Sequence, residues 1–317
     1  MAKEDKLNFK FSDLFTDRIW TLPTEAMSLA WKRIVRFVKL ARITLDTFAQ
    51  NRIGFQCQAL SYFTTMAIVP LLAFIFAVSG GLGMADKVSS FLNAVLPAIL
   101  EESIVEMVVD KAGNIIDAAK SGPVGVVSAL TFFWTIIWLM FQVERVFNNV
   151  WGIRKIPRNI FKRFGFYIGL MVLIPFIMII FGYGIAIYTN ASRLVGLNTD
   201  EMKYFSKFIS WLVFYAFTVL TLSAMYKFIP AVKVKYKFAL KAALFDAIVF
   251  VAFQYLYLET QVFVGRLNAV YGVLAAIPLF LLWLNFSWQI IMYGAELTYG
   301  YHNVDSYHIP EWETDDR

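Results

Sequence analysis

Several polar side chains lie inside stretches of this sequence that are otherwise apolar, and these are the places where chemistry could occur. Asp246 lies deep inside one such stretch, and Asn285, Gln289 and Glu296 recur at helical spacing inside the last one, on one face with Pro278, Leu281, Leu282 and Met292. Lipid can satisfy neither a carboxylate nor an amide, so these groups should face other helices or water. Burying a carboxyl group in a membrane is costly, which makes Asp246 a candidate to carry a proton, hold a cation or pair with an arginine across the bundle.

The elements that must position these groups are membrane helices. Hydrophobic residues make up 59% of the 317 residues and charged residues only 16%, whereas soluble domains have about 25% charged residues. Several apolar stretches are long enough to cross a hydrocarbon core of about 30 Å. They predict an all-α polytopic membrane protein with six transmembrane helices, at residues 54–79, 123–147, 164–189, 205–229, 239–263 and 272–298.

Basic residues in the connections predict how the spans are oriented. The segment before the first span carries ten Lys and Arg, the connection Arg145–Arg163 carries six, and the connection Lys227–Lys241 carries five. In contrast, residues 80–122 carry three Lys against six Asp and Glu. Cytoplasmic loops are enriched in Lys and Arg, so both termini are expected in the cytoplasm.

Three parts of the chain are expected outside the membrane domain, which covers residues 53–300. The first is a cytoplasmic arm, residues 1–52, with loosely ordered residues 1–23 and an amphipathic helix at Thr24–Gln50 that lies either in the headgroup region or against the protein. The second is a small helical extracytoplasmic insert, residues 80–122, which either covers the outer ends of the spans or forms a binding lid. The third is an acidic cytoplasmic tail, residues 301–317. The apolar stripe of the amphipathic helix is expected to comprise Met27, Trp31, Ile34, Val35, Val38, Leu45 and Phe48.

Polar residues gather in the cytoplasmic half of the predicted bundle. Counted from the turn near Leu267, Asp246 and Gln289 fall at nearly the same depth. Such clustering predicts a polar cavity open to the cytoplasm; the alternative is that the same residues only hold helices together. The residues expected to line the cavity are Asp246, Asn285, Gln289, Glu296, Gln56, Gln58, Ser61, Gln142 and Glu144, with a basic mouth formed by Arg52, Arg145, Arg154 and Lys155.

Prolines and paired asparagines predict local features of the backbone. The segment Phe147–Gly152, which follows the second span, reads FNNVWG, and its Asn148 and Trp151 are expected to form a turn at the membrane interface. Proline inside a helix removes a backbone hydrogen bond and usually kinks the helix. The prolines expected to do so are Pro70, Pro175 and Pro278.

Three stretches together resemble the YihY/BrkB family of bacterial inner-membrane proteins. They are Ala59–Phe63 with Val69–Leu72, the FNNVW segment, and the run from Tyr271 to Leu297. The resemblance covers about residues 30–300. It implies six spans with cytoplasmic termini in the bacterial cytoplasmic (inner) membrane. The family carries older "ribonuclease BN" and "virulence factor" names, and some members are linked to export of envelope lipid or lipopolysaccharide precursors.

These features favour translocation or export of an amphiphilic envelope component, a lipid or lipid-linked molecule. The expected partners are membrane lipids, among them anionic lipid or a lipopolysaccharide precursor. The sequence leaves open whether the protein forms a homo-oligomer. The alternative is a non-enzymatic scaffold or assembly factor for envelope proteins. No enzyme activity, nucleic-acid partner, cofactor or metal site is expected. Nuclease chemistry needs placed histidines or metal ligands, and His302, His308 and the single Cys57 do not provide them.

Overall fold

All the regular structure in the described part of the chain is helical. The computed structural model describes residues 17–20, 27–81, 122–153, 165, 200–264, 269–305 and 307. A short 3-10 helix, η2 (Asp17–Trp20), precedes the α-helices. The α-helices are α1 (Leu29–Gln50), α2 (Ile53–Gly81), α5 (Gly122–Val150), α7 (Asp200–Phe228), α8 (Tyr236–Val264) and α9 (Ala269–Asn303).

Five of the six predicted spans coincide with these helices, namely with α2, α5, α7, α8 and α9. The predicted span 164–189 and nearly all of the insert 80–122 lie outside the described residues. Among the described residues, three helices contain windows long and apolar enough to cross a membrane, at Trp211–Phe228, Tyr236–Gln261 and Ile277–Asn303. The chain therefore has the apolar helices of a membrane protein, and the total of six spans stays a prediction.

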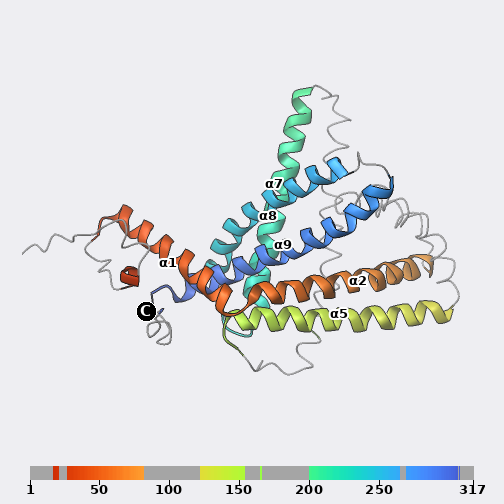
Figure 1. Ribbon diagram of the computed structural model, residues 1–317, viewed down its shortest axis with the longest axis horizontal. Helices are drawn as coiled ribbons and strands as arrows, with labels where there is room; N and C mark the ends of the chain where they lie inside the picture. Colours follow the sequence, from red (N-terminus) through yellow and green to blue (C-terminus); the bar gives the residue numbers. More distant parts are fainter. Residues whose placement is uncertain are drawn as a thin grey trace, which may run out of the picture.

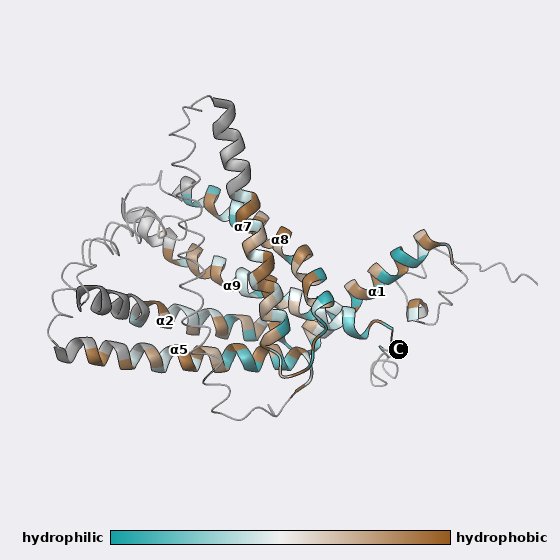
Figure 2. Cartoon of the chain, turned by 180° about the vertical axis from the view of Figure 1, so that it is seen from behind, coloured by the Kyte–Doolittle hydropathy of each residue, from teal (hydrophilic) through white to brown (hydrophobic). Residues whose placement is uncertain are grey.

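The long helices share one end at which α2 and α8 begin and α5, α7 and α9 end (Figure 1). In the described structure, α2 packs along α5, α8 packs along both α7 and α9, and α9 also touches α1 and α2. Figure 2 shows hydrophilic colour gathered where these helix ends meet α1. We call this end the basic end, because exposed cations flank it: Arg52, Arg145, Lys233, Lys235 and Lys241.

The core of the bundle lies near the basic end and is built from close helix contacts. Ala239, Ala242, Ala243 and Ala247 of α8 are fully buried. Their small side chains let neighbouring backbones approach closely, which is how helices associate where lipid offers no hydrophobic driving force. Larger buried side chains from the other helices complete this core, among them Leu60, Phe147, Tyr226 and Met292.

The structure corrects the predicted N-terminal helix. The helix α1 begins at Leu29, where the Ser28 hydroxyl accepts a hydrogen bond from the Trp31 N–H at 3.5 Å. The expected apolar stripe is only partly buried: Val35 is fully buried and Met27 and Val38 pack beside it, whereas the members at positions 31, 34 and 45 are exposed by 38%, 42% and 57%. The side chains of α1 that are buried are Val35, Leu40, Ile43, Thr44 and Thr47.

Two threonines explain why the stripe and the buried face differ. The Thr44 hydroxyl donates to the Leu40 carbonyl at 2.8 Å, and the Thr47 hydroxyl donates to the Ile43 carbonyl at 2.6 Å. Both hydroxyls are satisfied within α1, so these residues can be buried against other elements at little cost. A helical pattern that treats threonine as polar assigns Thr44 and Thr47 to the exposed side of α1 instead.

Described residues from both halves of the chain pack against α1. Ile19 in η2 is fully buried beside Val35, although residues 1–23 were expected to be loosely ordered. At the other end, α9 continues to Asn303, three residues beyond the predicted end of the membrane domain. Val304 is then buried beside α1, and the Tyr307 ring lies 5.2 Å from the Trp20 ring.

Candidate functional site

The carboxyl group of Asp246 is enclosed between three helices. Asp246 on α8 is 4% exposed, and the Tyr226 hydroxyl of α7 donates a hydrogen bond to its Oδ2 atom. A Cβ atom added to Gly294 of α9 would lie 2.6 Å from this same oxygen. The acid therefore faces protein and not lipid, and its partner is Tyr226, whereas the arginines Arg52 and Arg145 are exposed.

The depth predicted for Asp246 needs correction. Asp246 lies level with Gly294 and not with Gln289, which is five residues earlier and so about 7.5 Å farther along α9 at 1.5 Å per residue. The prediction counted 21 residues before Leu267 and 22 residues after it as equal depths. Gln289 instead donates to Asn285 on its own helix at 2.6 Å, and both side chains are partly exposed.

The predicted inward face of α9 turns outward in its first half. Pro278 is exposed, and Leu281 and Leu282 are exposed by 41% and 54%. Farther on, Met292 and Glu296 are fully buried, as expected of an inward face. Glu296 is thus enclosed by protein, whereas the side chains of Asn285 and Gln289 are partly exposed.

Glu296 belongs to a hydrogen-bonded group at the turn between α1 and α2. The Asn51 side-chain amide donates to Glu296 Oε1 at 3.2 Å. The Asn51 carbonyl accepts from the Gln56 amide at 2.9 Å and from the Asn149 amide at 3.0 Å. Arg52 follows with φ of 50°, a left-handed conformation that is costly for a residue other than glycine. These bonds tie α9 and α5 to the turn and stabilise it.

The FNNVWG segment ends α5 in a Schellman motif. Gly152 has φ of 66°, its N–H donates to the Asn149 carbonyl at 2.9 Å, and the Ile153 N–H donates to the Asn148 carbonyl at 2.9 Å. The Trp151 ring meets the Tyr299 ring edge-on at 5.4 Å, which fixes the turn against α9. The segment thus forms a turn, in which Gly152 and not an asparagine has the left-handed conformation; its predicted place at the membrane interface stays a prediction.

Asn148 also connects α5 to the loop between α7 and α8. Its side chain is fully buried, its Oδ1 atom accepts from the Ala231 N–H at 2.7 Å, and its Nδ2 atom donates to the Glu144 carbonyl at 2.8 Å. The same loop is held from the other side by Lys227, whose ammonium donates to the Val234 carbonyl. The Asn148 side chain thus joins α5 to the loop between α7 and α8 at the basic end.

Replacing Asn148 by alanine should lower the free energy of unfolding by about 1–2 kcal/mol, because the Ala231 N–H loses its acceptor. Thermal unfolding of the purified protein in detergent measures the change. The matched control is Asn149→Ala, which removes one bond from a partly exposed side chain. Equal losses in the two variants would show that Asn148 does not connect α5 to this loop.

The remaining predicted site residues differ in burial. Gln58 is exposed, Gln142 is half-buried, and Glu144 is 1% exposed. Ser61 is buried and donates to the carbonyl of Cys57 at 2.8 Å, within its own helix. Pro70 and Pro278 lie inside α2 and α9, where the kinks stay predictions. The predicted residues outside the described part of the chain are Arg154, Lys155 and Pro175.

A polar contact between α8 and α9 was missed by the sequence reasoning. Gln254 is 9% exposed and accepts a hydrogen bond from the Trp283 indole N–H at 3.0 Å. The Tyr257 ring stacks on the same indole at 5.1 Å. Gln254 lies two turns after Asp246 on the buried side of α8, a spacing that could have identified it. Among the described residues, no group of three His, Cys, Asp or Glu side chains could hold a metal ion.

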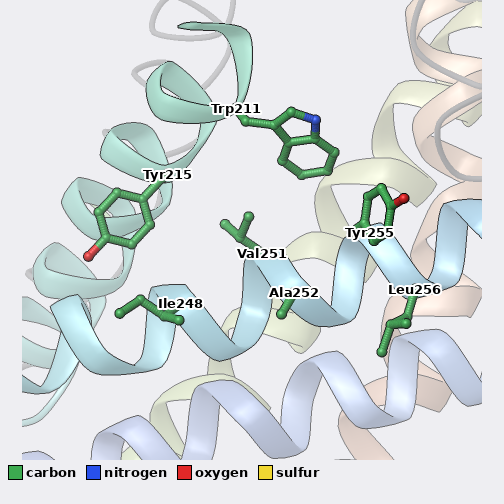
Figure 3. Close-up of a pocket in the computed structure, with 7 residues that line it drawn as sticks. All are labelled: Trp211, Tyr215, Ile248, Val251, Ala252, Tyr255 and Leu256. Atoms are coloured by element: carbon green, nitrogen blue, oxygen red, sulfur yellow. The ribbon is translucent and has the colours of Figure 1, made fainter. Parts of the chain in front are cut away.

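An apolar pocket of about 630 Å³ opens between α7 and α8 (Figure 3). Trp211 and Tyr215 of α7 face Ile248, Val251 and Tyr255 of α8 across it. The Tyr215 hydroxyl donates to the Leu244 carbonyl at 3.0 Å, which joins the two helices at one end of the pocket. Its wall of aromatic and aliphatic side chains suits a hydrocarbon chain.

Comparison with known proteins identifies the family. Residues 44–317 match the family described as Virulence factor BrkB, a match that includes α2, α5, α7, α8 and α9. The chain belongs to the BrkB family.

Relatives of this BrkB-family chain are named as membrane proteins. A UPF0761 membrane protein of Mannheimia succiniciproducens is 28% identical over 79% of this chain and 85% of its own length. One from Haemophilus influenzae is 26% identical over 79% of this chain and 90% of its own length. One from Pseudomonas paraeruginosa is 28% identical over 82% of this chain, which spans only 62% of that relative. No solved structure matches the chain.

Proposed function

We propose that this BrkB-family protein translocates an amphiphilic envelope component, a lipid or lipid-linked molecule, without enzymatic chemistry. The observation that carries the proposal is the arrangement around α8. The apolar pocket opens beside Ile248 and Val251, while the enclosed carboxyl group of Asp246 lies on the buried side of the same helix. An amphiphile needs both surfaces, one for its hydrocarbon chain and one for its headgroup.

Protein encloses the Asp246 carboxyl group in the described conformation, so a lipid headgroup cannot reach it. Tyr226 and Gly294 contact this carboxyl group, and Glu296 on α9 is fully buried. Translocation therefore requires α9 to separate from α7 and α8 at this contact. We place the protein in the bacterial inner membrane with both termini in the cytoplasm, which puts the basic end beside the anionic headgroups of that leaflet.

The test is movement of a fluorescent phosphatidylglycerol between the leaflets of liposomes that contain the purified full chain. Asp246→Asn should reduce the initial rate at least about tenfold, which corresponds to about 1.4 kcal/mol of activation free energy. The matched control is Glu259→Gln, the same change at an exposed position of α8, which should keep the rate. If the Asp246→Asn variant moves the lipid at the original rate, Asp246 is not part of the mechanism.

The exposed side of α1 favours a second candidate function. Ile34, Phe37 and Leu45 are exposed by 42%, 64% and 57%, and an exposed apolar surface suits binding to other proteins as well as to the membrane. The protein would then be a scaffold or assembly factor for envelope proteins. Absence of movement for every lipid tested, with the protein folded in the liposomes, would favour this second function.

A further inference from the structure

A second pocket, unrelated to the Asp246 contact, lies where α1 meets both ends of the chain. It has a volume of about 370 Å³ and is enclosed by η2, α1 and the residues that follow α9. Lys32, Arg36 and Lys39 line it from one face of α1, at positions i, i+4 and i+7. Trp20 and Tyr307 form an aromatic wall, with ring centroids 5.2 Å apart.

The charge of the pocket is unbalanced. Three cationic side chains face one carboxylate, that of Asp305, which leaves a net charge of +2 on the lining residues. Asp305 Oδ2 lies 3.4 Å from Arg36 Nη2, and the two side chains are exposed by 86% and 53%. A pair this long and this exposed contributes little to stability, so a better anion can displace the carboxylate.

Lys39 is half-buried in the pocket. Its ammonium lies 5.7 Å from the centroid of the Trp20 ring, a cation–π distance. Burial lowers the pKa of Lys39, and the charge of Asp305 opposes that shift. A negative group in the pocket is therefore favourable for Lys39, and a group with two negative charges is more favourable than one carboxylate.

We propose that this pocket binds a phosphoryl group, as a phosphomonoester dianion that takes the place of the Asp305 carboxylate. The guanidinium fork of Arg36 matches two phosphoryl oxygens, and Lys32 and Lys39 supply the further positive charge. The aromatic wall and Val35 cover the organic part of the ligand. No residue of α7 or α8 lines this pocket, so its ligand binding can be measured without an assay of translocation.

Isothermal titration calorimetry of the full chain in detergent with phenyl phosphate tests the proposal. Arg36→Gln should weaken binding at least about tenfold, in keeping with a charge-assisted hydrogen bond of about 1.5–3 kcal/mol. Asp305→Asn should tighten binding, because the competing carboxylate is gone. The matched control is Arg33→Gln, an exposed arginine on the same helix that does not line the pocket, and it should bind like the original protein.

A second ligand pair identifies the source of the phosphoryl group. Dioctanoyl phosphatidic acid carries a phosphomonoester and dioctanoyl phosphatidylcholine does not. Arg36-dependent binding of phenyl phosphate assigns the pocket to soluble phosphate esters, and Arg36-dependent binding of phosphatidic acid alone assigns it to lipid headgroups. The proposal is overturned if neither binds, or if Arg33→Gln weakens binding as much as Arg36→Gln does.

Discussion

Replacing Gly294 by valine is expected to destabilise the protein by about 3 kcal/mol, at the upper end of the usual cost of overpacking. A Cβ atom at Gly294 would lie 2.6 Å from Asp246 Oδ2 and 2.6 Å from Tyr226 Cζ. Carbon atoms in contact prefer a separation of about 3.5–4.0 Å. Tyr226 and Asp246 are 1% and 4% exposed, so neither has room to retreat. With valine at position 294, α9 therefore cannot keep its close contact with α7 and α8.

Gly54 provides the control for this substitution. A Cβ atom at Gly54 would meet only Phe48 Cε1, at an ordinary contact distance of 3.8 Å. Gly54→Val has the same change in helix propensity without the clash. Thermal unfolding in detergent should show a much larger loss for Gly294→Val. Similar midpoints for the two variants would mean that α7, α8 and α9 do not meet closely at Gly294.

Replacing Tyr226 by phenylalanine is expected to cost about 2–3 kcal/mol, because the buried carboxyl group of Asp246 loses its hydrogen-bond donor. The change removes one oxygen atom and leaves the ring packed against Phe147. The loss therefore comes from the unsatisfied acid and not from a cavity. Unfolding of the purified protein by heat in detergent measures it.

A double-mutant cycle separates this hydrogen bond from other effects. In the Tyr226→Phe and Asp246→Leu double variant, both partners are apolar and no polar atom of the pair is left buried. It should be more stable than the sum of the two single losses predicts, by more than about 0.5 kcal/mol. Additive losses would show that the Tyr226 hydroxyl and the Asp246 carboxyl group do not interact.

Apolar length was enough to predict where the long helices lie. It predicted α7, for example, at 205–229, whereas the helix runs from Asp200 to Phe228. Helix ends depend on caps, and the cap of α5 at Gly152 was visible in the sequence because asparagine and glycine are typical of such ends. The beginning of α1 was placed five residues too early, since Thr24 and Ser28 can both cap a helix.

The partners of the polar groups could not be predicted in the same way. Asp246 was identified by its type and position, but its bond to Tyr226 crosses the loop between α7 and α8, and no spacing rule connects residues on different helices. The same holds for Asn148 and Ala231, which are 83 residues apart. The pocket at α1 brings Trp20 together with Tyr307 from the opposite end of the chain, a pairing that only the folded structure contains.

The helix α9 extends from the contact with Tyr226 and Asp246 to the pocket at α1. From Pro278 to Asn303 it spans roughly 38 Å at about 1.5 Å per residue. Along the way it touches α7 and α8 at Gly294 and α1 at Gly300, where an added Cβ atom would lie 3.4 Å from Leu40 Cδ2. Two residues past its tip comes Asp305, the counter-charge of the α1 pocket. Separation of α9 from Tyr226 as one rigid helix would therefore also move Asp305 relative to Arg36, and this would couple ligand binding at the α1 pocket to that separation.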